Sequence, residues 1–175
     1  MWLMFLEAKV AIQDFLETGG DVLYVIGFVT LVMWTLIVER WWYYRTQYPK
    51  LAAQVIATWQ AREETESWYA HKIRAAMISQ VTESLNASIP MIKTLVALCP
   101  LLGLLGTVTG MVEVFDVMAI TGSGNARAMA SGVSKATIPT MAGMVVAISG
   151  VFFSTRLERY AAAEAERTAD QLIQH

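Results

Sequence analysis

Residues 94–112, TLVALCPLLGLLGTVTGMV, and residues 136–155, ATIPTMAGMVVAISGVFFST, decide the fold of this chain. Neither run contains a charged residue, and a short connection rich in Gly, Ser and Asn joins them. At 1.5 Å per helical residue, they span roughly 28 Å and roughly 30 Å, which matches the thickness of a bilayer's hydrocarbon core. The two runs therefore predict a hairpin of membrane-crossing helices.

A third apolar run lies nearer the N-terminus. Residues 22–38 carry no charge, and Trp41, Trp42, Tyr43 and Tyr44 follow directly after Glu39 and Arg40. Clustered Trp and Tyr are typical of the membrane–water interface, so this run predicts the first span. Before it, apolar residues recur at helical spacing up to Gly19 and Gly20, which predicts a helix lying on the membrane. These apolar positions are Trp2, Phe5, Leu6, Ile12 and Leu16.

These patterns define an all-α, polytopic membrane protein with three spans, the second and third of which extend into the cytoplasm. Pro90 marks the entry to the second span, and the Gly- and Pro-free tail predicts that the third helix continues beyond the membrane. The sequence AREETES at 61–67 predicts a solvated helix within the loop. The predicted segments are 1–20 (amphipathic helix), 21–44 (first span), 45–90 (cytoplasmic loop with helical content), 91–119 (second span), 120–132 (periplasmic loop), 133–155 (third span) and 156–175 (cytoplasmic helical tail).

Composition and charge exclude several function classes. The 175 residues are 55% hydrophobic and 16% charged, which is too apolar for an ordinary soluble domain. A net charge of −2 with dispersed cations argues against binding to nucleic acid. The one cysteine, Cys99, lies inside an apolar run, where packing is its expected role. His71 and His175 have no ligand-type neighbours, so we expect solvated side chains, no metal and no cofactor.

The positive charges predict the orientation of the spans. Ten of the thirteen Lys and Arg residues fall in the loop, the tail or their borders, against Lys9 and Arg127 on the other side, and Lys135 stands at the edge of the third span. Because cations are retained on the cytoplasmic side, the N-terminus is expected outside and the C-terminus in the cytoplasm.

Small residues form a seam along the second and third spans. With Thr140 between Ala136 and Gly143, they recur at steps of three or four, so each helix presents one face on which another helix can approach closely. Helix packing alone would explain such a seam, and the choice between packing and a functional pore stays open at this level. The seam residues are Gly103, Gly106, Gly110, Ala136, Gly143, Ala147 and Gly150.

Two threonines lie among these small residues, deep in the predicted spans. Helix geometry puts Thr107 and Thr140 at a common level, and a hydroxyl cannot hold a proton at physiological pH. If ions cross here, a carboxylate has to come from a partner helix. Glu113 and Lys135 are predicted to face each other at the outer mouth, with Asp116 one turn further out, although all three would equally serve as helix ends. The candidate ion pathway comprises Thr107, Thr140, Glu113, Lys135 and Thr137.

Three stretches resemble the ExbB/TolQ/MotA family of proton-motive-force motor subunits, and its ExbB branch most closely. They are GGDVLYVIGFVTLVMWTLIVERWW at 19–42, LCPLLGLLGTVTGM at 98–111 and GVSKATIPTMAGMVVAIS at 132–149. Thr107 matches the threonine of the family's second-span motif, and Thr140 matches that of the third span. The compact loop resembles the shorter ExbB proteins of second TonB systems.

The resemblance implies a pentamer in the bacterial inner membrane whose second and third helices line a pore. An ExbD-like single-span partner would supply an aspartate near the threonines, and a TonB-like protein would transmit the work to uptake of iron-siderophores, haem or vitamin B12 across the outer membrane. Lys135 departs from the family, where a glutamate is common, and Glu113 is expected to compensate. A TolQ-like role in envelope integrity and a non-conducting scaffold remain alternatives. No nucleophile, acid–base pair or metal site assembles, so no enzyme is expected.

Overall fold

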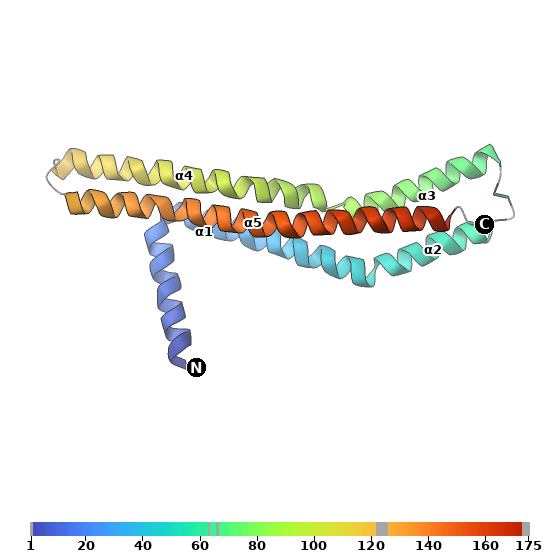
Figure 1. The fold of residues 1–175 in the computed structure, drawn as a ribbon, viewed down its shortest axis with the longest axis horizontal. Coiled ribbons are helices and arrows are strands. Elements are labelled where there is room, and N and C mark those ends of the chain that lie inside the picture. The colour runs from blue at the N-terminus through green and yellow to red at the C-terminus, as the bar shows by residue number, and fades with distance from the viewer. Residues whose placement is uncertain (1, 63, 66, 122–125, 173–175) are drawn as a thin grey trace. The chain divides into compact units, whose positions relative to one another are not determined.

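The structure, a computed structural model, describes residues 2–62, 64–65, 67–121 and 126–172. Helices account for nearly all of these residues, and no strand occurs among them, which confirms the all-α prediction. Three helical segments are long and apolar enough to cross a membrane: Gly19–Thr46, Trp68–Ile120 and Met129–Gln171. The helices are α1 (Trp2–Thr46), α2 (Tyr48–Gln60), α3 (Trp68–Asn86), α4 (Ile89–Thr121) and α5 (Ala126–Gln171) (Figure 1).

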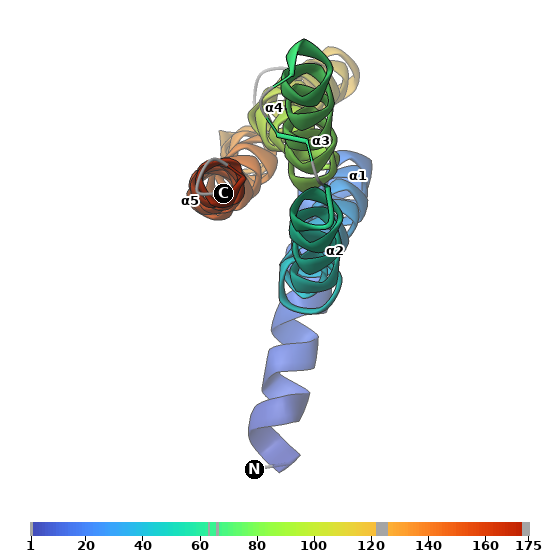
Figure 2. The same ribbon diagram turned by 90° about the vertical axis from the view of Figure 1, so that its right-hand side faces the viewer.

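The chain divides into two compact units. Unit 1 comprises Met1–Met33 and Thr94–Gly150, and unit 2 comprises Trp34–Lys93 and Val151–His175. Within unit 1, the portions of α4 and α5 run side by side in opposite directions (Figures 1 and 2). Its core contains Val29, Cys99 and Ala147, with three further apolar residues packed around them: Leu95, Leu102 and Val146. Cys99 is buried, as its position in an apolar run predicted.

A sharp break interrupts α1 within unit 1. Gly20 has φ +68°, a left-handed conformation that only glycine adopts without strain. The segment before this glycine therefore leaves in a different direction from the span that follows it (Figure 1). Its backbone is helical, but the apolar side chains predicted to line one face of it (Trp2, Phe5, Leu6, Ile12 and Leu16) lie outside the described residues.

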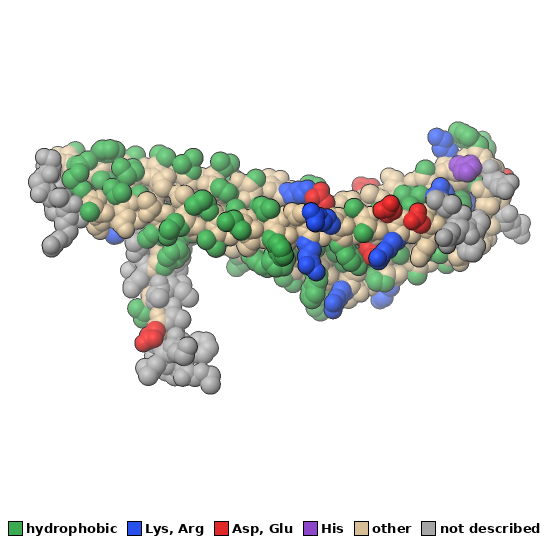
Figure 3. All heavy atoms as spheres, viewed as in Figure 1, with side chains coloured by type: hydrophobic (Ala, Val, Ile, Leu, Met, Phe, Trp, Pro, Cys, Tyr) green, Lys and Arg blue, Asp and Glu red, His purple; other side chains and the backbone are tan. Residues whose placement is uncertain are grey.

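Large apolar side chains are exposed along unit 1. On the face seen in Figure 3, hydrophobic side chains cover α4 and α5 of this unit, whereas most charged side chains belong to unit 2. Exposed apolar surface of this extent marks contact with lipid or with other proteins. On α4 the exposed set includes Leu101, Leu104, Leu105, Val108, Val112 and Phe115, and on α5 it includes Met141, Met144, Val145 and Ile148.

Unit 2 is held by polar contacts as well as by apolar packing. Arg40 is only 4% exposed, and its guanidinium donates to the Ser84 carbonyl at 3.0 Å and to Ser88 Oγ at 2.7 Å. Tyr44 donates to the carbonyl of Leu85 at 2.8 Å. Further along, an apolar cluster forms from Trp59, Ala70 and Leu172. Both hydrogen-bonded side chains tie α1 to the α3–α4 segment.

Two sequence predictions differ from the structure. The described residues of 61–67 are not helical, because α2 ends at Gln60 and Ser67 caps α3 by accepting a hydrogen bond from the Ala70 amide at 3.2 Å. A capping serine starts a helix rather than continuing one. The predicted connection at 120–132 is also too long, since α4 continues to Thr121 and α5 begins at Ala126. Pro90 is the second residue of α4, and α5 is continuous to Gln171.

Candidate ion pathway

The glycines of the seam bring α4 and α5 of unit 1 into backbone contact. A Cβ placed on Gly103 would lie 2.9 Å from the Cα of Thr140, and one on Gly143 would lie 2.5 Å from the carbonyl oxygen of Cys99. At Gly110, the corresponding neighbour is Ala136 Cβ at 2.7 Å. No larger side chain fits at these positions without moving a helix, so the small residues define the register of the pair.

The same register joins the helices through a hydroxyl group. Thr140 Oγ1 on α5 donates a hydrogen bond of 2.8 Å to the Gly103 carbonyl on α4. The bond is possible because Gly103 lets the backbones approach so closely. One of the two threonines predicted for the pathway thus also links the two helices.

The other pathway threonines bond to their own helices. Thr107 Oγ1 donates to the Leu104 carbonyl at 2.6 Å, and Thr137 Oγ1 donates to the Ser134 carbonyl at 2.8 Å. A carbonyl oxygen only accepts, so each hydroxyl has used its proton and keeps free lone pairs. These threonines therefore offer acceptors, which suit a protonated carboxylic acid or a hydrated cation better than a carboxylate.

The contacts also fix the depth of the two threonines. Gly106 faces Pro139 and Gly110 faces Ala136, so Thr107 is level with the residue two positions before Thr140. Two helical residues correspond to about 3 Å along the axis. The pair thus lies at nearly the same depth within unit 1. Thr107 and Thr140 are both half-buried, whereas Thr137 is exposed.

The predicted pair at the outer mouth is not formed within one chain. Gly132 packs against Val114, which puts Glu113 and Lys135 within about one helical turn of each other in depth. Both side chains are exposed, and in the described part of the chain the ion pairs are Lys93–Glu158 and Arg167–Glu164. A pairing of Glu113 with Lys135 across neighbouring subunits stays a prediction. Asp116 is likewise exposed.

A proline that the sequence analysis overlooked is part of the seam. Pro139 is fully buried, and its ring packs where a side chain on Gly106 would otherwise lie. Proline cannot donate the usual helical hydrogen bond to the carbonyl four residues earlier, which is that of Lys135. A proline one residue before a pathway threonine, inside an apolar run, is the signal that would have identified it.

A metal-binding cluster would be a further kind of site in the described part of the chain. No group of three or more His, Cys, Asp or Glu side chains there has a geometry that would hold a metal ion. His71 is exposed on α3, and His175 lies outside the described residues. The two hydroxyl-bearing runs contain no ionisable side chain between Thr94 and Val112 or between Ala136 and Thr155, apart from Cys99.

Three apolar helices long enough to span a bilayer, two of them joined by a small-residue seam, define a multi-pass membrane protein. Comparison with family models agrees with this class. Residues 46–170 match the MotA/TolQ/ExbB proton channel family, and the chain belongs to that family. This is a family of transport and channel proteins, and its ExbB-type members are among the relatives of the chain.

Individual relatives cover less of the chain. An ExbB-like biopolymer transport protein of Synechocystis is 51% identical over 61 residues, which are 33% of this chain and 24% of that protein. An ExbB biopolymer transport protein of Vibrio cholerae is 39% identical, over 38% of this chain and 29% of that protein. The Tol-Pal system protein TolQ of Pseudomonas aeruginosa is 36% identical, over 46% of this chain and 37% of that protein. The chain thus spans well under half the length of these relatives, and no solved structure matches it.

Proposed function

We propose that this chain is the ion-channel and stator subunit of an inner-membrane motor that uses the proton motive force to energise TonB-dependent uptake of iron-siderophores, haem or vitamin B12. In this proposal, copies of the chain form a homo-oligomer, as a pentamer, with α4 and α5 toward the pore. An ExbD-like single-span protein lies within it and supplies an aspartate, and a TonB-like protein transmits the work. The N-terminus faces the periplasm and the C-terminus the cytoplasm.

The observation that carries this proposal is the state of the threonine hydroxyls. Thr107, Thr137 and Thr140 all donate to backbone carbonyls, so they keep only acceptor capacity. An aspartic acid of a partner carries the proton that such acceptors bind, whereas this chain has no carboxylate at that depth. The hydroxyls would therefore stabilise the protonated form of the partner's carboxyl group during transfer.

Proton flux into proteoliposomes tests this function. We expect flux when the chain is reconstituted with its ExbD-like partner and none when either component is alone. Thr107→Val and Thr140→Val each remove the acceptor at constant volume and are expected to lower the flux roughly ten-fold, the equivalent of about 1.4 kcal/mol. The matched control is Thr109→Val, because Thr109 is exposed on α4 and bonds to the carbonyls of Leu105 and Gly106. Absence of flux from the wild-type chain with its partner would support a non-conducting scaffold instead, and wild-type flux from Thr107→Val and Thr140→Val would overturn the role of the hydroxyls.

A TolQ-like role in the Tol-Pal system is the second candidate, which the similarity to a TolQ protein favours. Deletion of the gene separates the two systems. Loss of receptor-dependent iron uptake with normal detergent resistance supports the TonB role, and detergent sensitivity with normal uptake supports the Tol role. Native mass spectrometry of the complex released from lipid, with neighbouring gene products co-expressed, would test the pentamer and identify the partners.

A further inference from the structure

A cavity of about 520 Å³ opens in unit 2 between α1 and α5. Its walls are mainly aromatic and aliphatic. Trp34 meets Phe153 edge-on with ring centroids 5.0 Å apart, and Tyr44 lies 5.2 Å from Tyr160. Ile37, Val38 and Leu157 complete the apolar lining. A volume of this size is typical of small-molecule sites, and the lining suits an acyl chain.

Two arginines stand in the wall of this cavity. Arg45, from the last turn of α1, lies over the Trp41 ring at 4.9 Å, and Arg156 comes from α5. Both are exposed, and neither takes part in the ion pairs found in the described part of the chain. Two guanidinium groups that form no ion pair with a carboxylate among the described residues therefore border an apolar cavity.

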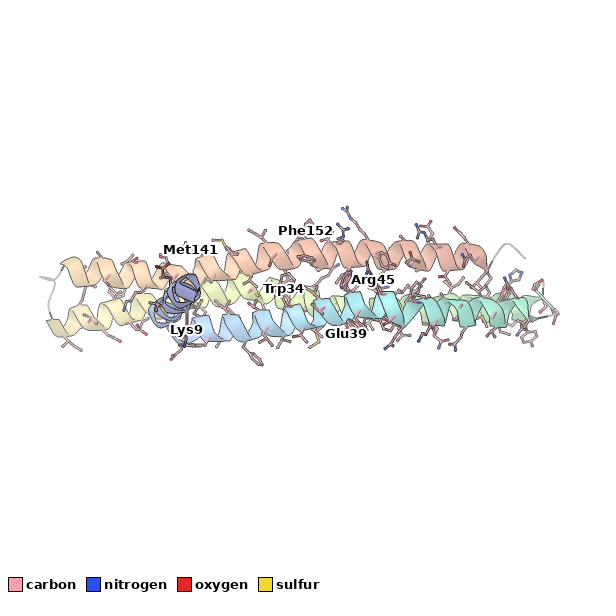
Figure 4. All side chains as sticks on the ribbon, turned by 90° about the horizontal axis from the view of Figure 1, so that it is seen from below. Lys9, Trp34, Glu39, Arg45, Met141 and Phe152 are labelled. Carbon is pink, nitrogen blue, oxygen red and sulfur yellow. The ribbon has the colours of Figure 1, made fainter. Side chains whose placement is uncertain are left out.

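The nearest acidic residue on α1 does not neutralise them. Glu39 belongs to a different cavity, which it shares with Arg40 and Tyr43. Figure 4 shows Trp34 and Arg45 on the side of α1 toward α5, and Glu39 on the other side. On α5, Glu158 is paired with Lys93 at 2.6 Å. The two guanidinium groups at the cavity are thus able to bind an anionic ligand.

The position along the span indicates which ligand. The cavity lies at the Thr46 end of the candidate span Gly19–Thr46, next to the Trp and Tyr residues of the interfacial belt. A guanidinium binds phosphate through two parallel hydrogen bonds, and cations near the surface attract anionic lipids. We propose that this cavity binds one anionic phospholipid, with its phosphate on Arg45 and Arg156 and an acyl chain against Trp34 and Phe153.

The test is native mass spectrometry of the full chain in its complex, titrated with phosphatidylglycerol or with phosphatidylcholine of the same acyl chains. We expect a retained phosphatidylglycerol for each copy, and weaker retention of phosphatidylcholine. Arg45→Gln and Arg156→Gln should each weaken phosphatidylglycerol binding about five-fold, and the double variant more. The control is Arg159→Gln, which removes an exposed cation of α5 that does not line the cavity.

A second variant tests the cavity rather than the charge. Val38 is 53% exposed and lines the cavity, so Val38→Trp should reduce lipid retention with both arginines intact. Val25→Trp, at an exposed position of α1 in unit 1, should not. Equal retention of the two lipids, or unchanged retention in the double arginine variant or in Val38→Trp, overturns the proposal. Displacement of the lipid by inorganic phosphate as readily as by a short-chain phosphatidylglycerol also overturns it, because the acyl chain would then contribute nothing.

Discussion

The hydroxyl of Thr140 donates a hydrogen bond of 2.8 Å to the carbonyl of Gly103 on the neighbouring helix. A residue of the candidate ion pathway is therefore also a residue of the helix seam. The packing hypothesis and the pore hypothesis for the small residues do not exclude each other at this position. The loss of this hydroxyl can therefore act through the contact between the helices or through ion binding.

Replacement of Thr140 by serine distinguishes the hydroxyl from the methyl group. Thr140→Ser keeps the donor to Gly103 and the free lone pairs, so most of the proton flux should remain, whereas Thr140→Val should lose it. Both variants should assemble to the same mass as the wild type. Loss of flux in Thr140→Ser, with assembly intact, would show that the hydroxyl is not the group that matters.

The seam predicts that substitution of two glycines by alanine will have very different effects on stability. Gly143→Ala places a methyl group against the Cys99 carbonyl and should destabilise the protein by about 1–3 kcal/mol. Gly27→Ala meets no atom within 4 Å and, as a helical position, should be neutral or stabilising. Thermal unfolding in the same detergent compares them. Equal midpoints for the two variants would contradict the close approach of α4 and α5.

Arg40 and Lys93 are expected to differ in their contribution to stability. Arg40 is buried with two hydrogen bonds in unit 2, so Arg40→Gln should cost about 2–3 kcal/mol. Lys93 forms a half-exposed ion pair with Glu158, and Lys93→Gln should cost less than about 1 kcal/mol. Denaturant titration of both variants measures the difference, and a larger effect at Lys93 would refute it.

The buried hydroxyl of Tyr48 is expected to make the protein less stable at high pH. Its hydroxyl is 3.0 Å from the Glu164 carbonyl and 2.8 Å from Thr168 Oγ1, and burial raises the pKa of the phenol above its ordinary value. The folded state then favours the neutral phenol, so this contribution is complete below the unfolded pKa of about 10 and is lost as pH rises through the folded pKa.

Tyr48→Phe should therefore cost about 1 kcal/mol at neutral pH and show a shallower decline in stability above pH 10. Tyr69→Phe is the control, because Tyr69 is 72% exposed on α3. Thermal melts of both variants across this range provide the measurement. Parallel curves for Tyr48→Phe and the wild type would contradict the assignment.

Glu113 and Lys135 provide a charge-exchange experiment between subunits. If the two side chains pair across neighbouring copies, Glu113→Gln and Lys135→Met should each lower proton flux, and the exchange Glu113→Lys with Lys135→Glu should restore part of it. Restoration by the exchange would support a pair at the outer mouth. If the exchanged variant recovers no flux, while both single variants are inactive but assembled, the two charges do not pair and act separately.

The spans and the seam were predictable because a single physical pattern encodes each. An apolar run of bilayer length admits few folds, and glycines at helical spacing have one obvious use, as the contact of Gly110 with Ala136 illustrates. The position at which a helix ends is harder to predict, because side-chain capping competes locally with continuation of the helix. Ser67 belongs to a polar stretch with good helix formers, yet its side chain caps α3 instead.

The hydrogen bonds of the candidate site could not be predicted from the sequence. Sequence spacing indicates that Thr107 and Thr140 share a depth, but not that one hydroxyl bonds across the seam and the other within its own helix. That difference depends on the close approach of the two backbones at Gly103, which the spacing of residues in the sequence does not give. The role of Pro139, by contrast, could have been predicted from the sequence, because this proline directly precedes Thr140 within an apolar run.

Backbone contact along α4 and α5 of unit 1 has a mechanical consequence. Where two helices meet at glycines, almost no side-chain atoms separate their backbones. Sliding one helix past the other would therefore bring backbone atoms into steric clash. This hairpin should move as a single rigid body in any conformational change. Relative movement would then occur at the outer surface of the hairpin. There, exposed and flexible side chains such as Met141 and Met144 can change their packing against neighbouring lipid or protein.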